Sequence, residues 1–136
     1  MNIKFALAVG NSGTFEAKHF GDADKYLIYE WDGQNFYLST ELLNNFKNFD
    51  EQQHGSKKKG EAIIQFLQKN QVKVLVSKQF GKNIQLVNRF FLPVLVNDES
   101  PAEAIAKLKS NIKSIENEIS QNRENYKLFN LRTETY

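Results

Sequence analysis

The segment Ile3–Val9 constrains the fold of this chain more than any other feature of the sequence. It is apolar at every position except Lys4. A strand covered on both faces has this near-continuous apolar pattern, whereas a strand with one face in water alternates apolar and polar residues. The segment therefore predicts a strand inside a sheet that carries helices on its faces.

Two further strands are predicted as a hairpin. Residues 25–31 are rich in aromatic and branched side chains, and residues 36–40 form a second strand-like run. Asp32 and Gly33 lie between the two runs, and an Asp-Gly pair is a strong signal for a tight turn. We therefore expect the two strands to pair antiparallel.

The second half of the chain alternates helical and strand patterns. Residues 43–60 are mostly polar and lack apolar periodicity, which is typical of a functional or mobile loop. An amphipathic helix is predicted over residues 61–70. Two more strands are predicted, over residues 72–76 and 92–96, and a helical face lies between them, made by Phe80, Ile84, Val87 and Phe91. A long helix is predicted to begin at Ser100-Pro101-Ala102-Glu103. Its apolar face is made by Ala102, Ile105, Leu108, Ile112, Ile115 and Ile119.

This order predicts a single α/β domain over residues 1–136, with a mixed five-stranded sheet flanked by helices. Residues 109–136 are expected to form an extended C-terminal helix and tail. Ligands of such sheets bind outside the carboxyl ends of strands, near the point where the strand order reverses. The loops after the first strand and after the hairpin can reach such an end. They carry His19 and His54, the two histidines of the chain.

Composition excludes several classes of function. The absence of cysteine excludes disulfides, thiolate-held metal and thiol catalysis in this chain. A net charge of +2 is too small to indicate nucleic-acid binding. The first residues resemble neither a secretory leader nor a membrane span, so we expect a cytoplasmic protein with no membrane partner. The first strand has no carboxylate, which argues against two-metal nuclease chemistry.

The two histidines are the candidate metal ligands. Neutral imidazole binds iron and other transition metals well, and a site made by His19 and His54 alone would be weak and exchangeable, as a carrier requires. The alternative is that His19 hydrogen-bonds across its loop and that His54 is solvated. Lys57, Lys58 and Lys59 precede the predicted helix, whose amino end would attract anions. For Lys58 and Lys59 the simpler interpretation is a solvated charge run.

Residues 19–30 read His-Phe-Gly-Asp-Ala-Asp-Lys-Tyr-Leu-Ile-Tyr-Glu. They resemble the His-Phe-Gly-Arg-Ala…Tyr-Glu signature of the dinitrogenase iron-molybdenum cofactor biosynthesis family. His54-Gly55 is similar to the second His-Gly of that family, and residues 80–84 are similar to its Ile-Gly-Pro-Asn-Ala motif. The resemblance covers about residues 1–108, which would form the family-like core.

The resemblance implies a ribonuclease H-like fold without nuclease activity. It also implies a non-enzymatic carrier or accessory protein that transiently binds an iron-sulfur or iron-molybdenum cofactor precursor, with metallocluster donor and acceptor proteins as partners. His19 and His54 would be the metal ligands. The cofactor-binding residues that it implies are His19, Phe20, Gly21, His54, Gly55 and Asn83. Lys57 is added to them because it lies just before the predicted helix, whose amino end would attract an anionic cargo.

The sequence also departs from the family pattern. Residues 57–59 are lysines where the family has glycines, and Lys82 replaces a proline. These changes would make the pocket narrower and more positive, which favours a more anionic ligand. The alternative function is a protein-interaction or regulatory module that keeps the fold and has lost cofactor binding, with the last helix mediating homo-oligomer formation. An enzyme that uses metal-bound water would need a convergent acid-base pair, which the sequence does not indicate.

Overall fold

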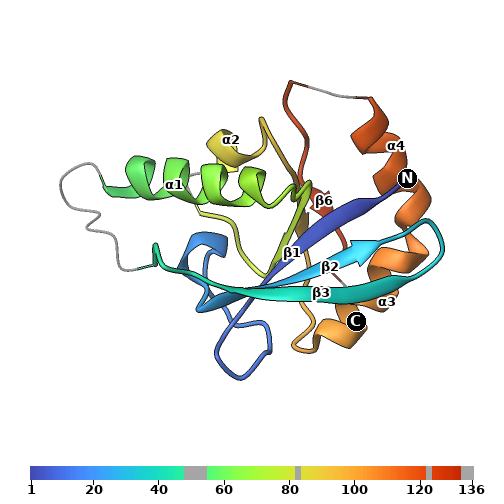
Figure 1. Ribbon diagram of the computed structural model, residues 1–136, viewed down its shortest axis with the longest axis horizontal. Helices are drawn as coiled ribbons and strands as arrows, with labels where there is room; N and C mark the ends of the chain where they lie inside the picture. The colour runs from blue at the N-terminus through green and yellow to red at the C-terminus, as the bar shows by residue number, and fades with distance from the viewer. Residues whose placement is uncertain (48–54, 82–83, 122–123, 133–136) are drawn as a thin grey trace.

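β1 (Ile3–Val9) lies inside a mixed six-stranded sheet in the computed structural model (Figure 1). The structure describes residues 1–47, 55–81, 84–121 and 124–132. After β1 the elements are the 3-10 helix η1 (Phe20–Asp22), β2 (Lys25–Trp31), β3 (Phe36–Leu43), α1 (Gly55–Lys69), β4 (Val74–Ser77), α2 (Ile84–Val87), β5 (Leu92–Leu95), α3 (Pro101–Ser110), α4 (Ile112–Ser120) and β6 (Phe129–Asn130).

The strands are ordered β3-β2-β1-β4-β5-β6 across the sheet. β2 pairs antiparallel with both β1 and β3, which confirms the predicted hairpin. β4, β5 and β6 extend the sheet in parallel pairing from β1. The predicted number of five strands is wrong, because β6 adds a sixth by pairing Phe129 with Val94 and Asn130 with Leu95. So short a strand has no apolar period, and no pattern in the sequence predicts it.

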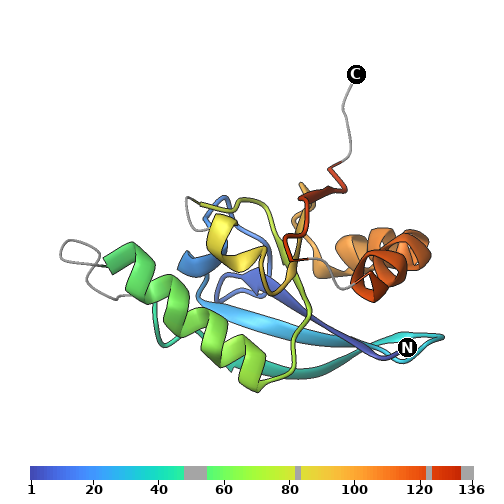
Figure 2. The same cartoon turned by 90° about the horizontal axis from the view of Figure 1, so that it is seen from above.

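Both faces of β1 are covered, as its apolar sequence predicts. Phe5 and Leu7 belong to one buried cluster, together with residues of α3 and α4. Ala6 and Ala8 point to the other face and belong to a second buried cluster, together with residues of α1 and α2. Successive side chains of a strand alternate between faces, so the two clusters lie on opposite sides of the sheet. Figure 2 shows α1 and α2 well separated from α3 and α4.

Two helices differ in extent from the prediction. α1 begins at Gly55, well before residue 61. α2 covers only Ile84–Val87, although the predicted helical face ran from Phe80 to Phe91. The chain turns directly after α2, where the amides of Phe90 and Phe91 both donate to the carbonyl of Val87 at 3.0 Å. Val87 and Phe91 are buried in the same cluster, so the apolar spacing identified core positions without identifying the length of the helix.

The predicted long C-terminal helix is divided into α3 and α4. Its start is confirmed, because Ser100 Oγ accepts a hydrogen bond from the amide of Ala102 at 3.2 Å. The division lies at Asn111, whose Nδ2 donates to the carbonyl of Lys107 at 2.9 Å. The predicted apolar face is wrong at one position, since Ala102 is exposed and Ala104 is buried.

The C-terminal residues pack onto the sheet. Ile115 is fully buried, and Tyr126 is 8% exposed. The amide of Tyr126 donates to the carbonyl of Asn88 at 2.8 Å, and the amide of Leu131 donates to the carbonyl of Leu95 at 2.8 Å. Among the described residues, no helix has both the length and the apolar composition needed to cross a membrane.

Candidate functional site

The candidate site lies where the loops after β1 and β4 meet at the carboxyl edge of the sheet. From β1 the chain continues to β2 on one side, and β4 pairs with β1 on the other, so the strand order reverses at this point. His19 and Gln79 form an isolated parallel bridge, and the amide of Phe20 donates to the carbonyl of Gln79 at 2.9 Å. The structure therefore places His19 at the position where ligands of open α/β sheets bind.

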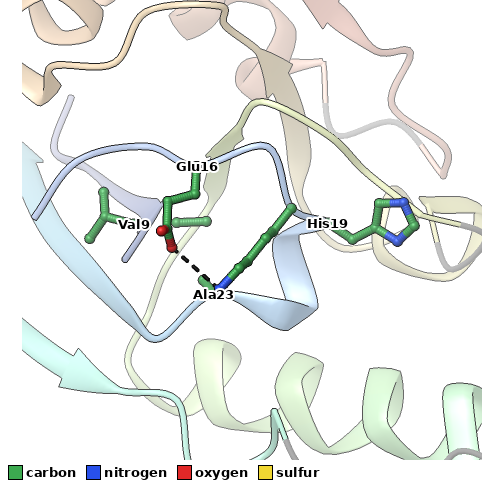
Figure 3. Close-up of a pocket in the computed structure, with 6 residues that line it drawn as sticks. Val9, Glu16, His19 and Ala23 are labelled. Carbon is green, nitrogen blue, oxygen red and sulfur yellow. Dashed lines mark ion pairs between the residues drawn. The ribbon is translucent and has the colours of Figure 1, made fainter. Parts of the chain in front are cut away.

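The His19 side chain is exposed. Its imidazole points away from Val9, Glu16 and Ala23 (Figure 3). The ring instead lies against the backbone of Gly81, where a Cβ atom would be only 2.7 Å from Nδ1. The hydrogen bonds that cross the loop at this point are made by the backbone, and within the described ranges the imidazole makes none. The alternative interpretation of His19 as a loop-bridging side chain thus finds no support among those residues.

A shallow surface depression lies beside His19; it is open to solvent and has no enclosed space large enough for a water molecule. Its rim includes an ion pair between Lys18 and Glu16, whose Nζ and Oε1 atoms are 3.4 Å apart (Figure 3). The pair cancels one positive charge close to His19. The residues that line the depression are Ala8, Val9, Glu16, Lys18, His19 and Ala23.

Phe20 anchors the loop that carries His19. It is 4% exposed, and its ring stacks on Tyr26 at a centroid distance of 4.8 Å and on Phe80 at 5.7 Å. The Tyr26 hydroxyl donates to the carbonyl of Phe20 at 2.9 Å, and burial raises the pKa of Tyr26 well above its usual value. Gly21 follows and is half-buried against Ile63 of α1. The aromatic packing therefore fixes the backbone on which His19 stands.

The interpretation of Lys59 as a solvated residue is wrong. Its side chain is 4% exposed, forms an ion pair with Asp22 and donates to the carbonyl of Lys47 at 3.1 Å. Lys58 is exposed, as predicted. All of residues 57–59 lie inside α1 rather than before it, because the helix begins at Gly55. The predicted helix began at residue 61, so Lys59 was expected before the helix and not on its inward face.

Asn44 is a second buried polar residue that the sequence analysis missed. Its Nδ2 donates to the carbonyls of Gly21 at 2.9 Å and Ala23 at 2.8 Å, and its Oδ1 accepts from the amide of Phe46 at 3.0 Å. Asn44 thereby holds the segment after β3 against the segment around η1. It lies in a stretch of many polar residues, where no pattern distinguishes one buried asparagine from its solvated neighbours.

Several of the predicted site residues are not placed by the structure. His54 and Asn83 lie outside the described residues. Gly55 and Lys57 lie in the first turn of α1, and only their helical backbone is described. The proximity of the two imidazoles therefore stays a prediction.

The donor set around His19 limits what it can hold. The described part of the chain contains no group of three or more histidine, aspartate or glutamate side chains arranged to ligate a metal ion. The described residues thus offer one exposed imidazole nitrogen as a donor at this edge of the sheet.

Comparison with known proteins agrees with the resemblance of residues 19–30. No curated protein matches the chain. A family model described as dinitrogenase iron-molybdenum cofactor matches residues 1–111, which include β1 to α3 and the whole candidate site. The chain belongs to the dinitrogenase iron-molybdenum cofactor family.

Proposed function

We propose that this protein is a non-enzymatic carrier or accessory protein that transiently binds an iron-sulfur or iron-molybdenum cofactor precursor. The family relates the chain to the iron-molybdenum cofactor. The observation that carries the proposal is the exposed imidazole of His19 at the reversal point of the strand order. Metallocluster donor and acceptor proteins would be its partners.

The chemistry of the site supports transfer rather than permanent storage. A neutral imidazole supplies one nitrogen lone pair to iron or molybdenum, and a cluster held by one or two such ligands can be displaced by a stronger set. The imidazole of His19 is exposed, so a cargo bound to it would stay accessible to an acceptor protein. Gly55 and Lys57 at the amino end of α1 would favour an anionic cargo, because helix amino ends attract negative charge.

The scaffold is part of the proposal. An antiparallel β2 between β1 and β3, with β4 and β5 parallel to β1, supports a ribonuclease H-like fold. Lys4 is the one ionisable side chain of β1, so a two-metal nuclease would lack a carboxylate on this strand. A binding function without catalysis is consistent with that composition.

Anaerobic reconstitution tests the proposal. The full chain is mixed with isolated iron-molybdenum cofactor or with an iron-sulfur cluster donor, desalted, and assayed for retained iron and molybdenum. We expect the wild type to retain the metals, and both His19→Ala and His54→Ala to retain less. Lys113→Ala, which changes an exposed residue of α4, serves as the control and should bind as the wild type does.

Two outcomes would overturn the carrier function. One is a wild-type protein that retains neither cluster under these conditions. The other is equal retention by the wild type and both histidine variants, since the metal would then be held elsewhere. In the first case the interaction module becomes the better hypothesis.

The interaction-module alternative was based on the lysines at residues 57–59 and on the extended last helix, whose surplus length could mediate self-association. Leu108 and Ile115 are fully buried against the sheet, so the middle of that predicted stripe is used within the chain. These two side chains are therefore not available to a partner, and self-association through the C-terminal helices stays a prediction. A test by deletion of residues 109–136 would also remove core side chains, so surface substitutions on the full chain are the better experiment.

A further inference from the structure

β3 forms one edge of the sheet, since among the described strands it pairs with β2 alone (Figure 1). It has eight residues, whereas β6 at the opposite edge has two. An edge strand carries a row of backbone N–H and C=O groups that no neighbouring strand satisfies, and proteins commonly protect this row with proline or lysine. β3 contains neither.

The side chains of β3 are apolar for an exposed edge. Tyr37, Leu38 and Leu43 are 46%, 48% and 66% exposed, and they are three of the six large hydrophobic side chains exposed in the described part of the chain. Glu41 is the one charged residue of the strand, and its Oε1 is 3.3 Å from Nζ of Lys25 on β2. The edge therefore presents apolar surface without a net charge that would repel a second strand.

Hydrogen bonds at the two ends of β3 indicate which of its backbone groups face outward. The amide of Asp32 donates to the carbonyl of Asn35, and the amide of Asn44 donates to the carbonyl of Asp24, each at 3.1 Å. Both ends of the strand thus turn toward β2, and the direction alternates from residue to residue along an antiparallel strand. The two alternations meet at Ser39, which a bulge leaves outside the pairing with β2. The residues whose backbone groups turn outward are therefore Phe36, Leu38, Glu41 and Leu43.

We propose that β3 pairs antiparallel with β3 of a second copy of this chain, around a two-fold axis that passes through the bulge. In this register Phe36 lies opposite Leu43 of the second copy, and Leu38 lies opposite Glu41. All four outward-facing residues then meet an outward-facing residue, as a hydrogen-bonded ladder requires. Each copy has one bulge at the axis, so the interruption has the same length in both strands and the pairing resumes in register.

The same register suits the side chains. Opposite residues of an antiparallel pair lie on one face of the sheet, where aromatic and aliphatic side chains stabilise each other. Tyr37 lies opposite Leu42 of the second copy, and Phe36 likewise meets a leucine. Glu41 lies opposite Leu38 rather than the same glutamate, so no like charges meet. β3 thus matches itself in length, backbone direction and charge, which favours a second copy over an extended segment of another protein.

The interface is small, because one strand from each copy makes it. Stable complexes bury roughly 1,200–2,000 Å² of surface, so we expect a weak dimer that forms as the protein concentration rises. The dimer would have one continuous sheet and two candidate sites, since β2 separates this edge from β1 and the His19 loop. Self-association at this edge leaves the C-terminal helices uninvolved.

Sedimentation velocity of the full chain over increasing concentrations tests the proposal. We expect the weight-average mass of the wild type to rise toward that of a dimer. Leu38→Glu places a carboxylate opposite Glu41 of the second copy, twice in each dimer, and should raise the Kd about tenfold or more. Leu128→Glu is the matched control, because Leu128 is 41% exposed and lies next to β6 at the opposite edge. It should associate as the wild type does.

Disulfide cross-linking tests the register. The chain has no cysteine, so an introduced thiol is unique. In the proposed register the Cα atoms of residue 38 and of residue 41 in the second copy are about 5.5 Å apart, within reach of a disulfide. The two copies of residue 38 are three positions apart along the strand, about 10 Å, which a disulfide does not span. An oxidised equal mixture of Leu38→Cys and Glu41→Cys should therefore yield mainly the mixed dimer, identified by mass spectrometry.

A wild type that stays monomeric at every concentration would overturn the proposal, as would equal association of Leu38→Glu and the wild type. Mixed and like disulfides in statistical proportion would overturn the two-fold register. Should Leu38→Glu fail to fold, the two cysteine variants decide, since they replace exposed side chains without adding a charge. None of these readouts requires bound metal, so they stand apart from the test of the carrier function.

Discussion

At the scale of single residues, charged side chains connect the loops around the candidate site. Asp24 accepts a hydrogen bond from the amide of Asn11 at 3.1 Å and forms an ion pair with Lys47. The hydrogen bond from Lys47 is the main cause that lowers the pKa of Asp24, and burial opposes it. The carboxylate thus joins the segment after β1 to the segment after β3.

We expect Asp24→Asn to lower the free energy of unfolding at about pH 7 by about 1 kcal/mol, the upper end for a partly exposed ion pair. The pKa of Asp24 is lower in the folded than in the unfolded state. Its stabilisation is therefore present above the unfolded pKa of about 3.9 and is lost as the pH falls through the folded pKa. Urea unfolding should show that the difference in the free energy of unfolding between wild type and variant becomes smaller below about pH 4.

Glu61→Gln is the control for that titration, because Glu61 is an exposed carboxylate on α1. The free energy of unfolding of this variant should be close to that of the wild type at each pH measured. If Asp24→Asn lowered the free energy of unfolding by the same amount in strong acid, the ion pair would not be the cause of the loss.

At the scale of elements, a buried lysine connects α1 to η1. Lys59 is 4% exposed while its partner Asp22 is 46% exposed. Removing the lysine therefore leaves a carboxylate that water can reach, which is less costly than leaving a buried charge unpaired. Methionine in place of Lys59 keeps an apolar stem of similar length in the helix.

Lys59→Met should therefore change the global free energy of unfolding by less than about 1 kcal/mol. The local effect should be larger, because η1 loses its charged contact with α1. We expect amide exchange at Phe20 and Asp22 to rise by about tenfold, measured by hydrogen exchange.

Lys58→Met is the matched control at the neighbouring position, which is exposed. It should leave exchange in η1 at the wild-type rate. Equal exchange at Phe20 and Asp22 in both variants would show that the ion pair does not hold η1.

At the scale of the whole molecule, residues beyond the family match are part of the core. The match ends at residue 111, yet Ile115 of α4 is fully buried in the cluster that contains Phe5 and Leu7. We expect Ile115→Ala to lower the free energy of unfolding by about 3 kcal/mol, as for other large-to-small core substitutions. Chemical denaturation with Lys113→Ala as the exposed control would measure this, and a loss below about 1 kcal/mol would contradict the packing of α4.

Short-range patterns in the sequence determined much of the architecture. The apolar run of β1, the Asp-Gly turn between β2 and β3, and the Ser100 cap each act over a few residues, so the chain itself encodes them locally. The same patterns placed His19 in a loop at the carboxyl edge of the sheet. They did not predict β6, because a strand this short is too brief to show an alternation of apolar and polar residues. They did not predict the division of the last helix at Asn111, because the apolar residues keep their helical spacing across the break.

Tertiary structure alone decided how the candidate site is built. The contact of His19 with Gly81 and the ion pair of Lys59 with Asp22 join residues far apart in the chain. Asn44 is buried for the same reason, since it meets the loop before β2 only after the sheet has formed. The type and spacing of residues predict contacts between residues that are close in the sequence. These contacts instead depend on where the loops lie in space after the strands have paired. The sequence by itself therefore identified both histidines as candidate ligands, and the fold decided that the imidazole of His19 is exposed at the edge of the sheet, beside Gly81.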